Sequence, residues 1–128
     1  MQVNLSSGDY NIVSSGQAFL FGLDKNLKIS IVTDNNFEFF IVLKFRKDAY
    51  GEQKIDKKVS ENKITLTCFN FDDLGTGLVK PLRIARIEGK EIFLLFWSYL
   101  EGATKGKVRS VKYTVFMSNK LGDDLNVK

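Results

Sequence analysis

The sequence predicts an all-β protein, built as a two-sheet, mostly antiparallel sandwich of about eight or nine strands. Turn-forming Gly, Asn and Asp residues recur at short intervals along the chain. The segments between them are rich in Val, Ile, Phe, Tyr and Thr, and helical periodicity is weak throughout. We expect jelly-roll-like or immunoglobulin-like connections between the strands, with a closed barrel as the alternative.

The expected strands follow one another with short turns between them. A turn at Ser15-Gly16 separates the first two strands. Gly89 provides the positive φ of a tight hairpin over residues 87–91, and residues 59–63 form a second hairpin. The nine candidate strands are at about 9–14, 17–23, 27–33, 37–46, 53–59, 63–69, 81–87, 90–99 and 108–117.

Alternation of apolar and polar residues identifies the core face of several strands, because successive side chains of a strand point to opposite sides. Segments 27–31 and 64–68 alternate in this way, and the second places Cys68 in the core. Segments 37–45 and 92–99 are apolar on both faces, which suits central strands covered on each side or strands with a contact surface. The predicted core consists of Leu27, Ile29, Ile31, Phe39, Ile41, Leu43, Ile64, Leu66, Leu82, Ile84, Ile92, Leu94, Phe96, Val111, Tyr113 and Val115.

The length of 128 residues predicts a single domain over residues 1–128, with a tail at 118–128 that frays. The N-terminus has neither the charged nor the apolar region of a secretion signal. The longest apolar run, within residues 92–100, is shorter than the roughly 20 residues of a membrane-spanning helix. We therefore expect a cytoplasmic protein with no membrane partner.

The composition argues against an enzyme. No histidine is present, which excludes His-based metal sites, catalytic triads and His general acid–base chemistry. Cys68 is the single cysteine, so no internal disulfide or thiolate cluster can form. A carboxylate-based enzyme stays open as an alternative, but Glu38 and Glu91 lie at strand starts and should be exposed. We expect no cofactor and no metal.

A basic stretch at residues 105–112 is one candidate binding site. It contains four cations and no acid, and Lys105, Lys107 and Arg109 alternate onto one strand face that could neutralise phosphates. The plainer interpretation is a solvated hairpin that protects a sheet edge.

An aromatic set is the second candidate. Phe93, Trp97 and Tyr99 share one face of their strand, and Phe96 lies on the other with Ile92 and Leu94. One of these faces must pack in the core. The other is covered by a further layer or binds a partner, for which Trp and Tyr are favoured anchors, or a sugar.

The loop with Gly75, Thr76 and Gly77 is the third candidate. A Gly-x-Gly turn can present backbone N–H groups to an anion, but the phosphate-binding patterns need a following helix, which is not expected here. A structural crossover between the sheets is the favoured interpretation. The adjacent Asp72 and Asp73 alone make a poor calcium site.

The same region carries a family resemblance. The pattern is Asn70-Phe71-x-x-Leu74-Gly75-Thr76-Gly77, then Pro81-Leu82, a Phe-rich strand and Tyr113-Thr114-Val115-Phe116. It resembles a family of small bacterial domains of unknown function, over roughly residues 8–117. The resemblance implies a compact β domain of bacterial or phage origin and brings no catalytic residue.

These observations favour a non-catalytic module that binds another protein or a second copy of itself. A small bacterial or phage accessory, immunity or inhibitor protein would fit. The alternative is a ligand-binding β-sandwich for nucleic acid or carbohydrate. The predicted binding residues are Trp97, Tyr99, Phe93, Lys105, Lys107, Arg109, Gly75, Thr76 and Gly77.

Overall fold

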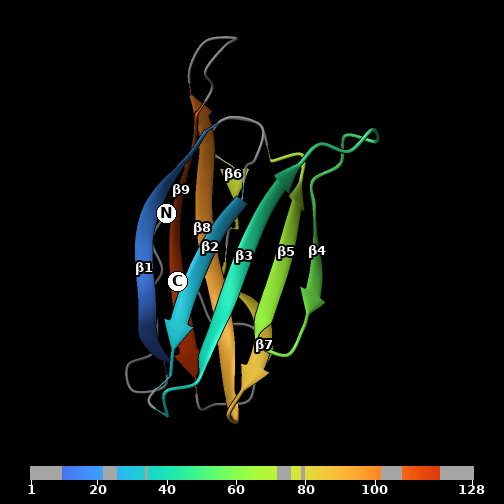
Figure 1. Ribbon diagram of the computed structural model, residues 1–128. Coiled ribbons are helices and arrows are strands. Elements are labelled where there is room, and N and C mark those ends of the chain that lie inside the picture. Colours follow the sequence, from blue (N-terminus) through green and yellow to red (C-terminus); the bar gives the residue numbers. More distant parts are fainter. Residues whose placement is uncertain are drawn as a thin grey trace.

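The protein folds into two β-sheets that lie one in front of the other (Figure 1). The computed structural model describes residues 10–21, 26–33, 35–71, 76–78, 80–101 and 108–118. Within these residues the regular structure is all strand. Among them no helix occurs that is long and apolar enough to cross a membrane. The predicted all-β, two-sheet sandwich is confirmed.

Sheet A has five strands. β9 (Val108–Ser118) lies between β1 (Tyr10–Phe21) and β8 (Lys90–Glu101) and is antiparallel to both. On its other side, β8 pairs with the short β6 (Thr76–Gly77) and with β7 (Leu82–Ile87). The sequence did not predict β6, because two residues are too few to show a period.

Sheet B has four strands, in the order β2 (Asn26–Val32), β3 (Glu38–Arg46), β5 (Lys63–Phe69) and β4 (Lys54–Val59). The pair β3 and β5 is parallel, whereas the other two pairs are antiparallel. The chain leaves β3, crosses the end of β5 to reach β4, and returns through a hairpin into β5. This path makes β5 parallel to β3 and gives a mixed sheet.

Alternate residues of both sheets face each other and form one core. Every side chain predicted to be in the core belongs to it, and Leu27, Leu82 and Tyr113 are half-buried at its margin. Cys68 is also fully buried there. Burial of one such apolar side chain stabilises the fold by roughly 1.5–3 kcal/mol, so the alternating pattern accounts for most of the driving force.

The predicted turn at Ser15-Gly16 is wrong, because β1 is continuous from Tyr10 to Phe21. The strand contains a bulge between Ile12 and Ser14 instead. Gly16 has a packing role: a Cβ there would lie 2.8 Å from the Tyr113 hydroxyl on β9. Glycine at this position makes room for a neighbouring aromatic side chain rather than reversing the chain.

Both predicted hairpins are confirmed. In the β7–β8 turn Glu88 and Gly89 have φ angles of 53° and 76°, as a type I′ turn requires. In the β4–β5 turn the Ser60 amide donates to the Lys63 carbonyl at 2.8 Å. The predicted frayed tail lies outside the described residues, apart from Ser118 at the end of β9.

Candidate functional site

The outer face of sheet A, which points away from the core, carries the predicted aromatic set. Ile92, Leu94 and Phe96 point into the core, so the odd-numbered residues of β8 point outward. Trp97 is 40% exposed there and Tyr99 is half-buried. Across β9, the 54% exposed Phe19 of β1 lies in the same row as Tyr99. We call Phe19, Leu95, Trp97 and Tyr99 the aromatic face.

Phe93 lies on the same side of β8 but is 2% exposed. Its direct neighbour on β9 is Phe116, and the two rings form a separate small cluster against which Leu95 packs. Phe93 therefore stabilises the fold on the outer side of the sheet, and the accessible part of the aromatic set is Trp97 and Tyr99.

A hollow of about 340 Å³ lies beside Trp97 on this face. Leu95 and Trp97 line it from β8, and Lys112 and Thr114 line it from β9. Lys112 is the register partner of Trp97 and is exposed. The hollow thus combines an apolar wall with one accessible positive charge, which suits an apolar side chain next to a carboxylate.

Gly77 has a structural reason to be glycine. In β6 it pairs with Trp97, and a Cβ at this position would lie 2.3 Å from the Phe96 carbonyl oxygen. The Leu78 amide donates to that same carbonyl at 2.9 Å. Only a residue without a side chain lets the backbone come this close to β8. Thr76 pairs with Ser98 through its backbone, and Gly75 lies outside the described residues.

Arg109 does not lie on an exposed basic face as predicted, because its side chain is 0% exposed. Its guanidinium donates to the Phe71 carbonyl oxygen and, at 3.2 Å, to Ser98 Oγ. It also lies 4.6 Å from the centroid of the Phe45 ring. These contacts tie β9 to β8, to β3 and to the chain that follows β5. The other two predicted cations, Lys105 and Lys107, lie outside the described residues.

Three side chains bear on catalysis, namely one thiol and two carboxylates. Burial raises the pKa of the Cys68 thiol to about 12, although the positive charge of Arg109 acts in the opposite direction. A thiol with this pKa stays protonated near neutral pH and is a poor nucleophile. Glu91 is buried, contrary to the expectation, and its Oε2 lies 3.7 Å from Arg83 Nε. Glu38 is exposed as expected and accepts a hydrogen bond from Ser30 Oγ at 3.1 Å.

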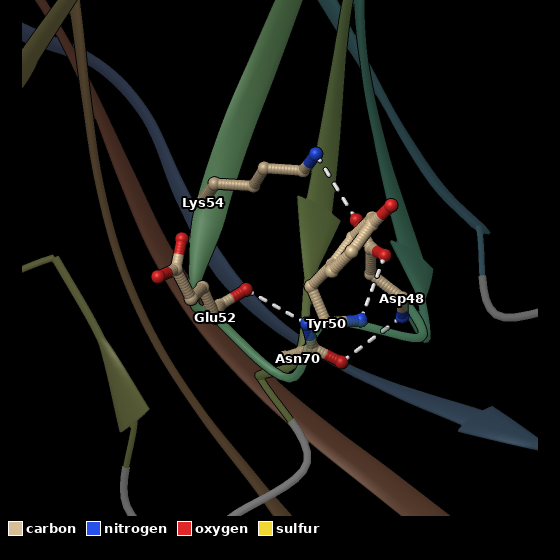
Figure 2. Close-up of polar contacts among 5 residues, drawn as sticks. All are labelled: Asp48, Tyr50, Glu52, Lys54 and Asn70. Carbon is tan, nitrogen blue, oxygen red and sulfur yellow. Dashed lines mark hydrogen bonds and ion pairs between the residues drawn. The ribbon is translucent and has the colours of Figure 1, made fainter.

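A feature that the sequence did not reveal is the ordered loop between β3 and β4 (Figure 2). Asn70, which follows β5 with a φ of 63°, accepts from the Asp48 amide and donates to the Glu52 carbonyl oxygen at 2.7 Å. Asp48 in turn accepts from the Tyr50 amide and from Lys54 Nζ, 3.0 Å away. The loop presents Tyr50, whose side chain is 88% exposed. The pattern Asp-Ala-Tyr-Gly signals the turn, but not the contact with Asn70 that anchors it.

A comparison with protein families identifies a match that covers most of the chain. The family model described as "Domain of unknown function (DUF6864)" covers residues 4–118. The chain belongs to this family. The expected resemblance to a family of unknown function is therefore confirmed. No curated protein and no solved structure matches the chain.

Proposed function

We propose that this member of the DUF6864 family is a non-catalytic module that binds another protein through the aromatic face of sheet A. The observation that carries the proposal is the exposure of large aromatic side chains on that face. Phe19 and Trp97 remain well exposed on two strands of a sheet whose inner side is already packed in the core. Large exposed aromatic side chains are enriched at protein interfaces and are otherwise costly to leave in water.

The chemistry of the face suggests the kind of partner. Among the described side chains of β1, β8 and β9, Lys112 is the charged one that is exposed. It adjoins the hollow beside Trp97. A partner with an apolar side chain flanked by Asp or Glu would fill the hollow and pair with this lysine. The lack of histidine and the buried, protonated Cys68 thiol support a role without catalysis.

A cytoplasmic accessory, immunity or inhibitor protein of bacterial or phage origin would use a surface of this type. Such proteins act by occupying a surface of their target, which requires a fixed contact face and no reactive group. The rigid sheet under Trp97 would hold the contact residues in place and lower the entropic cost of binding.

The test is capture of binding proteins from the native host in the presence of nuclease, with two matched aromatic variants. We expect Trp97→Ala to weaken capture of a specific protein by about thirtyfold or more, as loss of an interface anchor does. Tyr50→Ala removes an even more exposed aromatic side chain from the far end of sheet B and should leave capture unchanged.

A photo-crosslinking amino acid at position 19 should then attach to the captured protein. Equal capture by both variants, capture of a glycan instead of a protein, or a chain that stays monomeric and captures nothing would contradict the proposal. Crosslinking between two copies of this chain would show that the face serves self-association. Thermal unfolding of each variant confirms that a loss of capture is not a loss of fold.

A further inference from the structure

The outer face of sheet B has a composition quite different from that of β1, β8 and β9 in sheet A. Its outward positions are those that alternate with the buried residues of β2, β3 and β5 and continue across β4. Two acids, Glu38 and Asp56, lie among them. Six cations do so as well, and we call these the basic face: Lys28, Lys44, Arg46, Lys54, Lys58 and Lys63.

The six cations and two acids leave four positive charges on this face, as many as the formal net charge of the whole chain. The cations come from all four strands of sheet B, which Figure 1 shows in front of sheet A. Asp48 neutralises part of the charge at one end, where its carboxylate lies 3.0 Å from Lys54 Nζ. The remainder of the basic face can neutralise a polyanion that crosses the sheet.

Aromatic rings lie between these charges. The Lys28 ammonium lies 4.1 Å from the centroid of the Phe40 ring, and the Lys54 ammonium lies 4.8 Å from that of Phe69. Both rings are half-buried on the outer side of the sheet, so an edge or face of each reaches the surface. A base that stacked on such a ring would displace the ammonium toward the neighbouring phosphate, which keeps the charge neutralised.

We infer that the basic face is a second binding site, and that its ligand is single-stranded nucleic acid. A single strand offers an anionic backbone and unpaired bases, and proteins that bind it combine cations along a groove or sheet with aromatic side chains for stacking. Duplex DNA would use the charges but not the rings. An anionic membrane would need protruding apolar side chains, whereas Phe40 and Phe69 are half-buried with the Lys28 and Lys54 ammonium groups over their rings.

The β3–β4 loop adds a third aromatic side chain, at the end of sheet B where Lys54 pairs with Phe69. It joins two strands of the basic face, and Lys54 at the start of β4 is bound to Asp48 inside the loop (Figure 2). The hydrogen bonds of Asn70 fix the loop with the Tyr50 side chain exposed. Because the loop backbone is held in place, stacking of Tyr50 on a base would cost less conformational entropy than stacking of a residue in a free loop.

The experiment is fluorescence anisotropy of a labelled oligothymidylate, about 15 nucleotides long so that it can span the sheet. Binding is titrated between about 50 and 200 mM salt. If four to five phosphates are neutralised, the logarithm of the association constant should fall with the logarithm of salt concentration with a slope of about −3.

Two variants with lysine-to-glutamine substitutions, one in each sheet, distinguish the two faces of the molecule. Combining Lys28→Gln, Lys44→Gln, Lys58→Gln and Lys63→Gln should flatten the slope by about 2.8, because each lost phosphate contact contributes roughly 0.7 for single strands. Affinity at low salt should fall about a hundredfold or more. The control Lys90→Gln with Lys112→Gln removes charges of sheet A and should change affinity less than about twofold.

Tyr50→Ala tests stacking without risk to the fold, because the side chain is exposed; affinity should fall about tenfold. No binding at low salt overturns the inference, as does an equal loss in both charge variants. Competition by polyglutamate or anionic vesicles as strong as that by unlabelled oligothymidylate would also overturn it, because the face would then bind any polyanion. This site is independent of the aromatic face: Trp97→Ala should leave nucleic-acid binding intact.

Discussion

The outer face of sheet B differs in chemistry from the outer face of β1, β8 and β9 in sheet A, although both sheets share one core. Across β1, β8 and β9, sheet A presents Phe19, Trp97 and Tyr99 with Lys112 as the exposed charge among the described residues. Sheet B presents six cations with two half-buried rings between them. The inward positions are apolar in both sheets.

The fold therefore constrains one side of each strand and leaves the other side free. Burial explains the inward residues, and nothing in the packing of the core requires lysine outside sheet B or tryptophan outside sheet A. The outward residues are the part of the sequence in which function can be sought. Substitutions at Arg109, Gly77 and Asp48 test whether this division is real.

The largest loss of stability is expected from replacing Arg109, the buried cation of sheet A. Arg109 and Lys28 both contact a phenylalanine ring, at 4.6 and 4.1 Å from the centroid, but Arg109 is buried and Lys28 is exposed. We expect Arg109→Ala to lower the free energy of unfolding by about 3 kcal/mol or more, because it leaves a cavity and takes a donor from Phe71 and Ser98.

Lys28→Ala serves as the matched control and should cost at most about 1 kcal/mol, as exposed cation–π pairs do. Urea unfolding at neutral pH measures both values. Equal losses in the two variants would mean that burial does not separate the two cations, and the contrast between the sheets would be weaker than the structure indicates.

A smaller loss is expected at the edge of sheet A where β6 meets β8. Gly77→Ala places a Cβ against the Phe96 carbonyl oxygen, and overpacking of this kind costs roughly 1–3 kcal/mol. Gly89→Asn in the β7–β8 turn is the control, because asparagine tolerates the φ of 76° and a side chain there meets no atom within 4 Å. A tolerated Gly77→Ala would reopen the possibility that the glycine loop serves binding instead of backbone contact.

The sequence was sufficient to predict the core, because alternation in β2, β3 and β5 depends only on neighbouring residues. Alternation also placed Arg109 on the same side of β9 as Val111, Tyr113 and Val115, all of which were predicted to face the core. We expected exposure because of its charge. That expectation failed because the groups that accept its hydrogen bonds and the ring beneath it come from distant segments of the chain.

The aromatic face could be predicted only in part. The period of two puts Phe93, Trp97 and Tyr99 on one side of β8, but their exposure depends on the strand that pairs with them. Phe93 is buried because the register brings Phe116 next to it, whereas Trp97 lies next to Lys112. Register between β8 and β9 is not visible in the spacing of either strand. The same applies to the basic face, whose cations are scattered over four strands until the sheet brings them together.

The smallest effect is expected at β4, the edge strand of sheet B. Side-chain contacts of Asp48 hold the start of this strand, whereas a close approach of two backbones holds β6 in sheet A. The Tyr50 amide and the Lys54 ammonium lower the pKa of the Asp48 carboxyl below its usual 3.8. Since the folded pKa lies below the unfolded one, the stability from this carboxylate is present above about pH 4 and is lost as the pH falls through the lowered value.

Asp48→Asn should therefore lower stability near neutral pH, and the difference from the natural chain should disappear in acid. Urea unfolding near neutral pH and in acid measures the free energy of unfolding of both chains. Asp56→Asn is the control, because it removes the same charge from β4 outside the loop. A deficit of Asp48→Asn that is the same in acid would mean that the asparagine disturbs the loop by its shape, and that the charge of Asp48 does not hold β4 to the sheet.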